Sequence, residues 1–216
     1  MTLAATAPQS SPDSFPRVRE ATAADDREIR AFLAERPMDG VLRIALTRDP
    51  CFEAAAAAEG IRHHTVVARH RDGSLLGFGS RAVRPVYLAA KPVLMGYLAQ
   101  LRTGDRVPSI RRWREAFDWL RRTHRPDELA FDLTAIAEDN RPARRLLEAG
   151  LAGFPVYHRL TEVATLVFPT SRRRRRSPPA LPVVPEQRDE FLSLLRRALE
   201  PLPLATAWRQ EDFAPS

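Results

Sequence analysis

The chain has 216 residues, 44% of them hydrophobic, and a net charge of +7, which suits one globular domain of ordinary size with some additional chain. It contains no apolar run close to the roughly 20 residues that span a membrane, and its first residues lack the basic start and apolar core of a secretory signal. Cys51 is the single cysteine, which excludes an internal disulfide and fits a reducing cytoplasm.

The first elements are predicted from composition and capping residues. Residues 1–16 are small, polar and proline-containing, so we expect a disordered tail. Residues 17–19 are suited to a short strand. Thr22 and Asp25 have the spacing of a capping box, which predicts the start of a helix that ends near Pro37.

Two more helical stretches precede the next strand. One covers about residues 40–47. The other begins at Asp49-Pro50, with aspartate as the N-cap and proline in the first helical position, and runs through the alanines to Gly60. Cys51 lies at its start, so we interpret it as a small buried side chain and not as a nucleophile.

The middle of the chain predicts three strands and a helix. Residues 61–70 and 75–88 have strand character on either side of a turn that contains Gly73. A third strand covers residues 93–102. Ser109 is the expected N-cap of the helix that follows, whose apolar face is formed by residues at helical spacing: Ile110, Trp113, Phe117 and Leu120.

Residues 131–153 predict a strand that leads directly to the N-terminus of a helix. The apolar run Phe131–Ala137 is short enough for a strand, Pro142 fits the first helical turn, and Gly150 marks the end of the helix. A helix start carries free N–H groups and a partial positive charge, which suits a carbonyl or phosphate ligand. A hairpin over residues 154–168 is predicted next.

With the early helices counted as two, residues 17–169 give the order β-α-α-β-β-β-α-β-α-β-β. This order predicts an α/β fold with helices on both faces of the sheet. It also resembles the GNAT superfamily of acyl-CoA-dependent acyltransferases. The resemblance implies a twisted, mixed and mostly antiparallel sheet in an acyltransferase domain over residues 17–170.

Three stretches carry this resemblance. YLAQLR, residues 97–102, resembles the family's fourth strand, whose backbone pairs with the pantetheine arm of the coenzyme. Residues 103–112 lie where the family has its pyrophosphate loop. EDNRPARRLLEAGL, residues 138–151, resembles the element after the fifth strand, with its glycine one residue early.

The sequence departs from the family pattern at two places. The family's loop is rich in glycine, because glycines let successive backbone N–H groups close on a pyrophosphate. Here the aligned positions, which include Pro108 and Arg111, hold no glycine, and Gly104 lies too early. The family's tyrosine, which protonates the departing thiolate, corresponds to Leu147, although Tyr157 could approach the same space.

The resemblance implies acetyl-CoA as co-substrate. The residues that would bind it come from the fourth strand, the loop and the two following helices: Gln100, Leu101, Arg102, Arg106, Ser109, Arg111, Arg112, Asn140 and Arg144. Arginine side chains would supply charge where backbone donors are missing, but the same residues also suit a solvated helix start. Asn140 suits both a ligand contact and an N-cap.

Acyl transfer to an amine needs a base, a donor to the thioester oxygen and an acid for the thiolate. Glu138 and Tyr157 are the candidate base and acid, and the backbone N–H near Gln100 and Leu101 is the candidate donor. Glu138 also suits a helix N-terminus, and Tyr157 a half-buried strand. The histidines have no spacing that suggests a metal site or a triad, so no metal is expected.

Residues 171–187 are rich in arginine and proline and predict an extended linker. Removing the five charges of Arg172–Arg176 lowers the net charge from +7 to +2, so the domain itself is nearly balanced. Arginine dominates the basic residues, as in GC-rich bacterial genomes, and we therefore discount the high charge as a sign of nucleic-acid binding.

The C-terminal residues 188–216 predict an amphipathic helix and a tail. The apolar stripe is formed by residues at helical spacing: Phe191, Leu194, Leu195 and Ala198. One such helix is not stable alone, so it must pack on the first domain, on another chain or on a partner. The segment also resembles the start of a second, truncated GNAT-like unit.

These observations predict a cytoplasmic bacterial N-acyltransferase that uses a small-molecule or protein amine as acceptor, by direct transfer in a ternary complex. One alternative is an inactive GNAT-fold binding or regulatory module, which the altered loop and Leu147 favour. Another is an RNA- or polyanion-binding protein that uses the arginine run. No membrane contact is expected, and a homodimer is left open.

Overall fold

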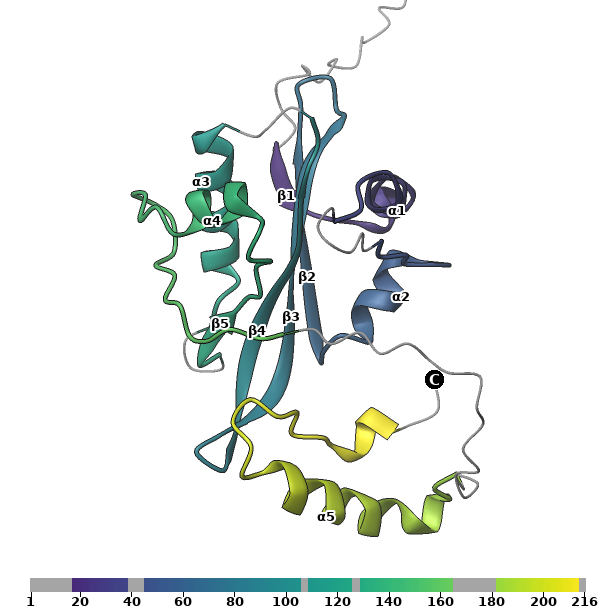
Figure 1. The fold of residues 1–216 in the computed structure, drawn as a ribbon. Helices are drawn as coiled ribbons and strands as arrows, with labels where there is room; N and C mark the ends of the chain where they lie inside the picture. Colours follow the sequence, from purple (N-terminus) through teal and green to yellow (C-terminus); the bar gives the residue numbers. More distant parts are fainter. Residues whose placement is uncertain (1–16, 39–44, 106–108, 126–128, 165–181, 214–216) are drawn as a thin grey trace, which may run out of the picture.

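The structure is a computed structural model that describes residues 17–38, 45–105, 109–125, 129–164 and 182–213 (Figure 1). Apart from short 3-10 turns, its elements are, in chain order, β1 (Val18–Glu20), α1 (Asp26–Glu35), α2 (Phe52–Ala57), β2 (Arg62–Arg69), β3 (Leu75–Leu88), β4 (Lys91–Thr103), α3 (Ile110–Arg122), β5 (Phe131–Leu133), α4 (Arg141–Leu147) and α5 (Arg188–Leu199).

The strands form one sheet in the order β1-β2-β3-β4-β5. Neighbouring strands are antiparallel except β4 and β5, which run parallel. β3 is buried along almost its whole length, because it has strands on both sides and helices over both faces. The predicted α/β class, with a mixed and mostly antiparallel sheet, is confirmed.

The helices divide between the two faces of the sheet. α1 and α2 lie on one face, and α3 and α4 lie on the other (Figure 1). On the first face, the ring of Phe78 in β3 packs edge-on against Phe32 and Phe52, with centroids 6.0 Å apart in both pairs. On the second face, Trp113 and Phe117 of α3 pack with Leu147 of α4. Each helix pair is therefore fixed by its own apolar cluster.

A buried ion pair ties β5 to the centre of the sheet. Arg81 of β3 has a side chain 2% exposed, and its Nε and Nη2 donate to the two carboxylate oxygens of Asp132 in β5 at 2.9 and 2.7 Å. Its Nη1 donates to Leu120 O and to Thr123 Oγ1, both at 3.0 Å. One guanidinium thus joins β3, β5 and the C-terminal end of α3.

Asp25 anchors the start of α1. The backbone N–H of Thr22 donates to its carboxylate at 2.7 Å, as the predicted capping box requires. Arg19 donates to both oxygens, at 2.7 and 2.8 Å, and Arg69 of β2 forms a second ion pair with the same carboxylate. The Asp25 side chain is 2% exposed, so β1, β2 and α1 meet at a buried, fully paired charge.

The predicted boundaries before α2 need correction. Of the helix expected at 40–47, the last three residues are irregular and the others lie outside the described residues. The expected cap at Asp49 is also absent, because α2 starts at Phe52 with Cys51 in the N-cap position. Asp26 explains the shift, since its Oδ1 accepts a hydrogen bond from the backbone N–H of Phe52 at 2.6 Å. A side chain from α1 therefore caps α2.

The hairpin predicted over 154–168 is not found in its described part. Residues 154–164 form no strand, and the remainder lies outside the described residues. Val156, Leu160 and Val163 are 75, 67 and 82% exposed. β5 is only three residues long, so it offers little edge on which such a hairpin could pair.

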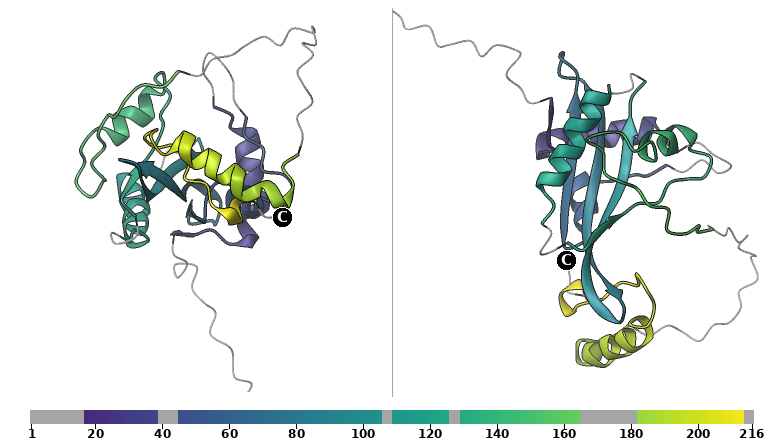
Figure 2. Two further views of the ribbon diagram at one scale, coloured as in Figure 1. Left: turned by 90° about the horizontal axis from the view of Figure 1, so that it is seen from below. Right: turned by 90° about the vertical axis from the view of Figure 1, so that its left-hand side faces the viewer.

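The segment after α5 packs on the far end of β3. Val86 and Thr206 form an antiparallel bridge, Tyr87 N donates to Ala205 O at 2.9 Å, and Leu204 N donates to Tyr87 O at 2.8 Å. Figure 2 shows α5 beside the tip of the hairpin that β3 and β4 form. Docking on the first domain is thus the outcome observed for this segment.

The buried stripe of α5 differs from the predicted one. Leu192 is its buried residue, whereas Leu194 is 55% exposed and Ala198 is also exposed. Phe191 packs edge-on against Phe213, with ring centroids 5.7 Å apart. The helix is rotated relative to the prediction because it packs on its own C-terminal turn. Residues 171–181 of the predicted linker lie outside the described residues.

Candidate active site

A cleft of about 920 Å³ opens where β4 and β5 part. The two strands pair only over Met95–Tyr97 and Phe131–Leu133. β4 continues to Thr103, but β5 ends four residues before the predicted Ala137. The continuing part of β4 and the residues after β5 line the cleft, so this edge of β4 has no partner strand in the described part of the chain.

A bulge shapes β4 beside the cleft. Phe78 pairs with Arg102 and Ser80 pairs with Ala99, so Gln100 and Leu101 together stand opposite a single residue of β3. Gln100 has φ of +57°, a left-handed conformation that residues other than glycine seldom adopt. Bulges redirect side chains and interrupt strand pairing, and the residues of this one line the cleft.

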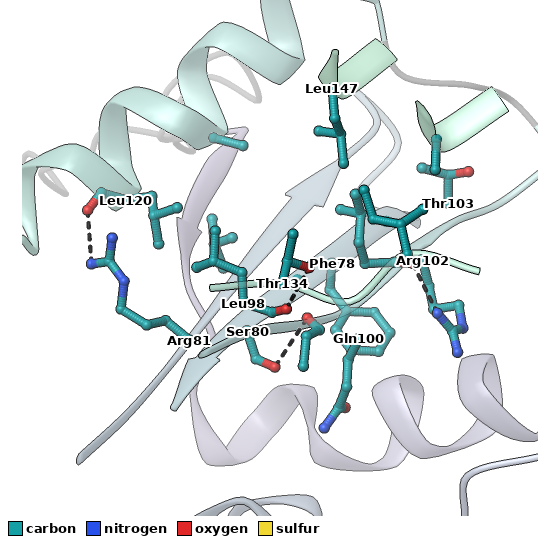
Figure 3. Close-up of a pocket in the computed structure, with 18 of the residues that line it drawn as sticks. Phe78, Ser80, Arg81, Leu98, Gln100, Arg102, Thr103, Leu120, Thr134 and Leu147 are labelled. Carbon is teal, nitrogen blue, oxygen red and sulfur yellow. Dashed lines mark hydrogen bonds between the residues drawn. The ribbon is translucent and has the colours of Figure 1, made fainter. Parts of the chain in front are cut away.

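The cleft extends to both faces of the sheet. On one face it is lined by residues of α3 and α4, including Trp113, Phe117 and Leu147. On the other it is lined by the end of α1 and by the chain around α2. Figure 3 shows this division: Leu120 and Leu147 lie on one side of β4, and Gln100 and Arg102 point to the other side. Such an opening allows two ligands to meet from opposite faces.

The predicted coenzyme residues divide into three groups. Those that line the cleft are Gln100, Leu101, Arg102, Arg112 and Asn140. Those outside its lining are Ser109, Arg111 and Arg144. Arg106 lies outside the described residues. Of the candidate catalytic residues, Tyr157 lines the cleft and Glu138 does not, whereas its neighbour Asp139 does.

The arginines at the start of α3 are paired with one carboxylate. Arg111 Nε donates to Glu115 at 3.0 Å, and Arg112 forms a second ion pair with Glu115. Arg111 is 83% exposed and Arg112 is 14% exposed. Two cations against one anion leave a net positive charge at this helix start. Ser109 is the N-cap of α3, as predicted, although its side chain makes no capping bond.

Asn140 caps α4. Its Oδ1 accepts a hydrogen bond from the backbone N–H of Ala143 at 3.2 Å, and Pro142 occupies the first turn. Arg144 of the same helix donates to Glu138 O at 3.4 Å and to Glu148 at 3.4 Å. The N-cap interpretation of Asn140 is therefore confirmed, and its role toward a ligand stays a prediction.

Tyr157 lies in the apolar cluster that contains Leu147. It packs against the group formed by Trp113, Phe117 and Leu147, although its segment is not a strand. Burial, with a smaller contribution from the Asp132 carboxylate, raises the pKa of Tyr157 to about 12. Its hydroxyl therefore stays protonated at neutral pH and can donate a hydrogen bond into the cleft.

A polar cluster that the sequence did not predict lies on the α1–α2 side. Arg48 pairs with Glu59, and Gln100 Nε2 lies 3.4 and 3.5 Å from the two Glu59 oxygens. The ring of His63 is also close, with its Nε2 3.9 Å from a carboxylate oxygen of Glu59. Burial lowers the pKa of His63. No spacing motif links these residues, because they come from a loop, a turn and two strands.

Close backbone packing fixes the turn that carries Glu59. Ile61 N donates to Val83 O at 2.8 Å, and a Cβ on Gly60 would lie 2.3 Å from that same oxygen. Only glycine fits such an approach, so the chain after α2 is held against β3. The Glu59 carboxylate is thereby directed toward Gln100 and the bulge.

Arg102 belongs to this side of the sheet as well. Directly paired residues in antiparallel strands project from the same face, and Arg102 pairs with Phe78, which packs under α1 and α2. Burial lowers the pKa of Arg102. Arg102 lies on the face of the sheet opposite to α3 and α4. It is therefore separated from the other arginines that the resemblance assigned to the coenzyme.

The described residues contain no group of three or more histidine, cysteine, aspartate or glutamate residues that could hold a metal ion. Among the helices of the same part of the chain, none is both long and apolar enough to cross a membrane.

No protein-family model and no curated protein sequence matches the chain.

Solved acetyltransferase structures are similar to it over about 70% of its length. They include a ribosomal-protein-alanine N-acetyltransferase from Brucella melitensis biovar Abortus 2308, with 14% identity, a TM-score of 0.49, and coverage of 70% of this chain and 97% of that one. A glucosamine-6-phosphate N-acetyltransferase from Arabidopsis thaliana has 12% identity, a TM-score of 0.48, and coverage of 69% and 96%. An acetyltransferase from Trypanosoma brucei has 16% identity, a TM-score of 0.44, and coverage of 68% and 98%.

Proposed function

We propose that the protein is an N-acyltransferase that transfers an acetyl group from acetyl-CoA directly to an amine in a ternary complex. The observation that supports this most is the open edge of β4 beyond its short parallel pairing with β5. An extended ligand arm with amide groups can add to such an edge as a strand would. The pantetheine arm of coenzyme A has this character.

The coenzyme would lie on the α3–α4 side of the cleft. Its amides would pair with β4 near Leu101, and Asn140 at the N-terminus of α4 would contact the arm. The pyrophosphate would approach the start of α3, where Ser109, Arg111 and Arg112 offer a helix N-terminus and a net positive charge. In this proposal Arg106 and Arg144 would contribute further charge.

The reaction would occur at the bulge. A backbone N–H at Gln100 or Leu101 would donate to the thioester oxygen as negative charge develops on it. The amine nitrogen attacks the carbonyl carbon, the C–S bond breaks, and the amine loses a proton. Tyr157 would donate a hydrogen bond to the departing thiolate from the position next to Leu147. Glu138, the base proposed from the sequence, lies outside the lining of the cleft, so it would accept the amine proton through a water molecule.

An inactive binding module is the second candidate, and the apolar side chain of Leu147 favours it. Leu147 is 5% exposed in the cluster beneath the cleft, where a tyrosine of the GNAT family would act as acid. Such a module would bind acetyl-CoA and transfer nothing. The third candidate, polyanion binding through Arg172–Arg176, concerns residues outside those described.

Calorimetric titration with acetyl-CoA tests the first proposal. We expect saturable binding of one molecule per chain. Ala135→Trp should abolish it, because Ala135 is exposed and lines the cleft directly after β5. Ala149→Trp is the control, since Ala149 is exposed on the same domain but does not line the cleft.

Two results would decide between the candidates. No binding by the unaltered protein would contradict the acyltransferase and the inactive acyl-CoA module together. Binding with no release of free thiol, across a panel of amines, would support the inactive module. Thiol release that Ala135→Trp abolishes and Ala149→Trp leaves intact would support the transferase.

A further inference from the structure

The α1–α2 side of the cleft holds buried polar atoms without partners. In the described residues these include the Nε atoms of Arg36, Arg48 and Arg102 and the Oε1 atom of Gln100, all in side chains that line the cleft. A buried polar group without a hydrogen-bond partner destabilises the folded state. Several around one opening indicate a ligand that completes their hydrogen bonds.

The cations of this side are unequally compensated. Arg48 pairs with Glu59, and Arg36 bonds to Glu35 at 3.1 Å. Arg102 contrasts with both, because its Nη1 donates only to Leu101 O, at 3.0 Å, and no carboxylate of the described residues pairs with it. A half-buried guanidinium without a counter-ion attracts an anion, and its planar fork fits a carboxylate or a phosphate.

Hydrogen-bond acceptors lie next to this cation. The Glu59 carboxylate and the unpartnered Oε1 of Gln100 are neighbours, since Gln100 Nε2 lies 3.4 Å from Glu59. Gln100 and Arg102 extend from β4 to the same side (Figure 3). An amine donates hydrogen bonds to acceptors of this kind. The bulge therefore places an amine-binding pair and an anion-binding cation two residues apart on one strand.

We propose that the acceptor is a small amine that also carries an anionic group, carboxylate or phosphate. In this proposal Arg102 binds the anion, while Glu59 and Gln100 hold the amine at the bulge where the thioester would lie. Arg48 orients Glu59 through their ion pair. The inference rests on the proposed function, because it assigns the second substrate of the same cleft. It also moves Arg102 from the coenzyme to the acceptor.

Calorimetry with matched amines tests the proposal without requiring turnover. Each titration is run with and without saturating coenzyme A, so that failure to bind the coenzyme is seen separately from failure to bind the acceptor. The carboxylate arm compares α-amino acids with their amides. The phosphate arm compares phosphoethanolamine with ethanolamine. We expect the anionic member of at least one arm to bind at least about tenfold more tightly than its neutral counterpart.

Variants then assign the roles. Arg102→Gln should weaken binding of the anionic amine about ten- to a hundredfold and leave binding of the neutral one and of acetyl-CoA unchanged. Glu59→Gln should weaken binding of both the anionic amine and its neutral counterpart, because both compounds carry the amine group. Arg27→Gln is the matched control, since Arg27 is exposed on α1 away from the lining of the cleft.

Two outcomes would overturn the proposal. One is equal binding of anionic and neutral amines in both arms, with or without coenzyme A. The other is an Arg102→Gln variant that loses acetyl-CoA binding and keeps the preference for the anionic amine, which would return Arg102 to the coenzyme. A preference confined to one arm identifies whether the anion is a carboxylate or a phosphate.

Discussion

Gly96 of β4 leaves the space that the carboxylate of Asp132 in β5 occupies. A Cβ on residue 96 would lie 1.9 Å from Asp132 Oδ1 and 3.3 Å from Arg81 Cδ. The parallel pairing of β4 with β5, and with it the position of the cleft, therefore depends on a glycine in the strand. A glycine within a strand often marks a close approach of this kind.

Gly96→Ala is expected to destabilise the protein by at least about 2 kcal/mol, as overpacking of a filled site does. Urea unfolding measures the effect. Gly79→Ala, also in the sheet, is the control, because its nearest neighbour would be Leu101 Cδ1 at 3.5 Å, an ordinary contact. Combining Gly96→Ala with Asp132→Ala should cost less than the sum of the two changes. If the two changes in the free energy of unfolding were simply additive, the new methyl group would not be in contact with the Asp132 carboxylate.

Asp132→Leu should cost about 3–5 kcal/mol, because the Arg81 side chain is 2% exposed and its charge would stay buried without a partner. Arg81→Leu should cost less, because the Asp132 side chain that it leaves unpaired is 23% exposed. Arg81→Leu and Asp132→Leu test this by urea unfolding. The double variant should be less destabilised than either single variant, since it leaves no uncompensated charge. Arg122→Gln, at an exposed site on α3, should change the free energy of unfolding by less than about 0.5 kcal/mol. If Asp132→Leu changed the free energy of unfolding as little as Arg122→Gln does, the stabilising role of the ion pair would be contradicted.

The stability of the protein should fall in acid through Asp25. Hydrogen bonds from Arg19, and further ones from Thr22 and Arg69, hold the pKa of the Asp25 carboxyl well below its usual range. Because this pKa is lower in the folded state than in the unfolded state, the stabilisation is complete above pH of about 4. It is lost as pH falls from there toward the folded pKa.

Asp25→Asn should therefore lower the free energy of unfolding near neutral pH and flatten its dependence on pH below about 4. Urea unfolding at a series of pH values checks both effects. Asp118→Asn is the control, because Asp118 pairs with Arg121 at an exposed site on α3. An unchanged acid slope in Asp25→Asn would exclude Asp25 as its source.

Asn140→Ala should cost about 1 kcal/mol through loss of the α4 cap. Asn140→Ser retains a capping oxygen and should be nearly neutral for stability. If Asn140 also contacts the coenzyme, both variants should weaken acetyl-CoA binding in calorimetry, because serine is too short to reach a ligand held by the amide. Full binding by Asn140→Ser would confine the residue to capping.

Tyr157→Phe tests the proposed acid. We expect kcat to fall at least about 100-fold while acetyl-CoA binding is retained, because the ring still packs in the same cluster. Since burial raises the pKa of Tyr157 to about 12, the unaltered enzyme should show no loss of kcat from this residue up to pH 10. Unchanged kcat in the variant would remove Tyr157 from the reaction.

Much of the fold follows from local sequence patterns. β3 over Leu75–Leu88 and α3 with its cap at Ser109 agree with the prediction, because alternation, helical spacing and capping act within a few residues. Helix α2 was misplaced because its cap comes from Asp26, which is distant in sequence. The stripe of α5 was misread because its partner is Phe213.

The site was predictable only where one stretch of chain forms it. Asn140 and Gln100 lie in such stretches, and both line the cleft. The cluster of Arg48, Glu59 and His63 is assembled by tertiary packing from separate segments, so no spacing could indicate it. Arg102 was assigned from its place in a motif, whereas its face is set by pairing with Phe78.

The pairing of Val86 with Thr206 has a consequence for synthesis of the protein. Nascent chains are synthesised at about 5–20 residues per second. The edge of β3 near Val86 therefore stays unpaired for roughly 6–24 seconds, until residue 206 has been synthesised. An unpaired edge strand is a template for pairing with other chains. On crowded polysomes, neighbouring nascent chains thus have a window in which one copy can donate its late segment to the edge of another.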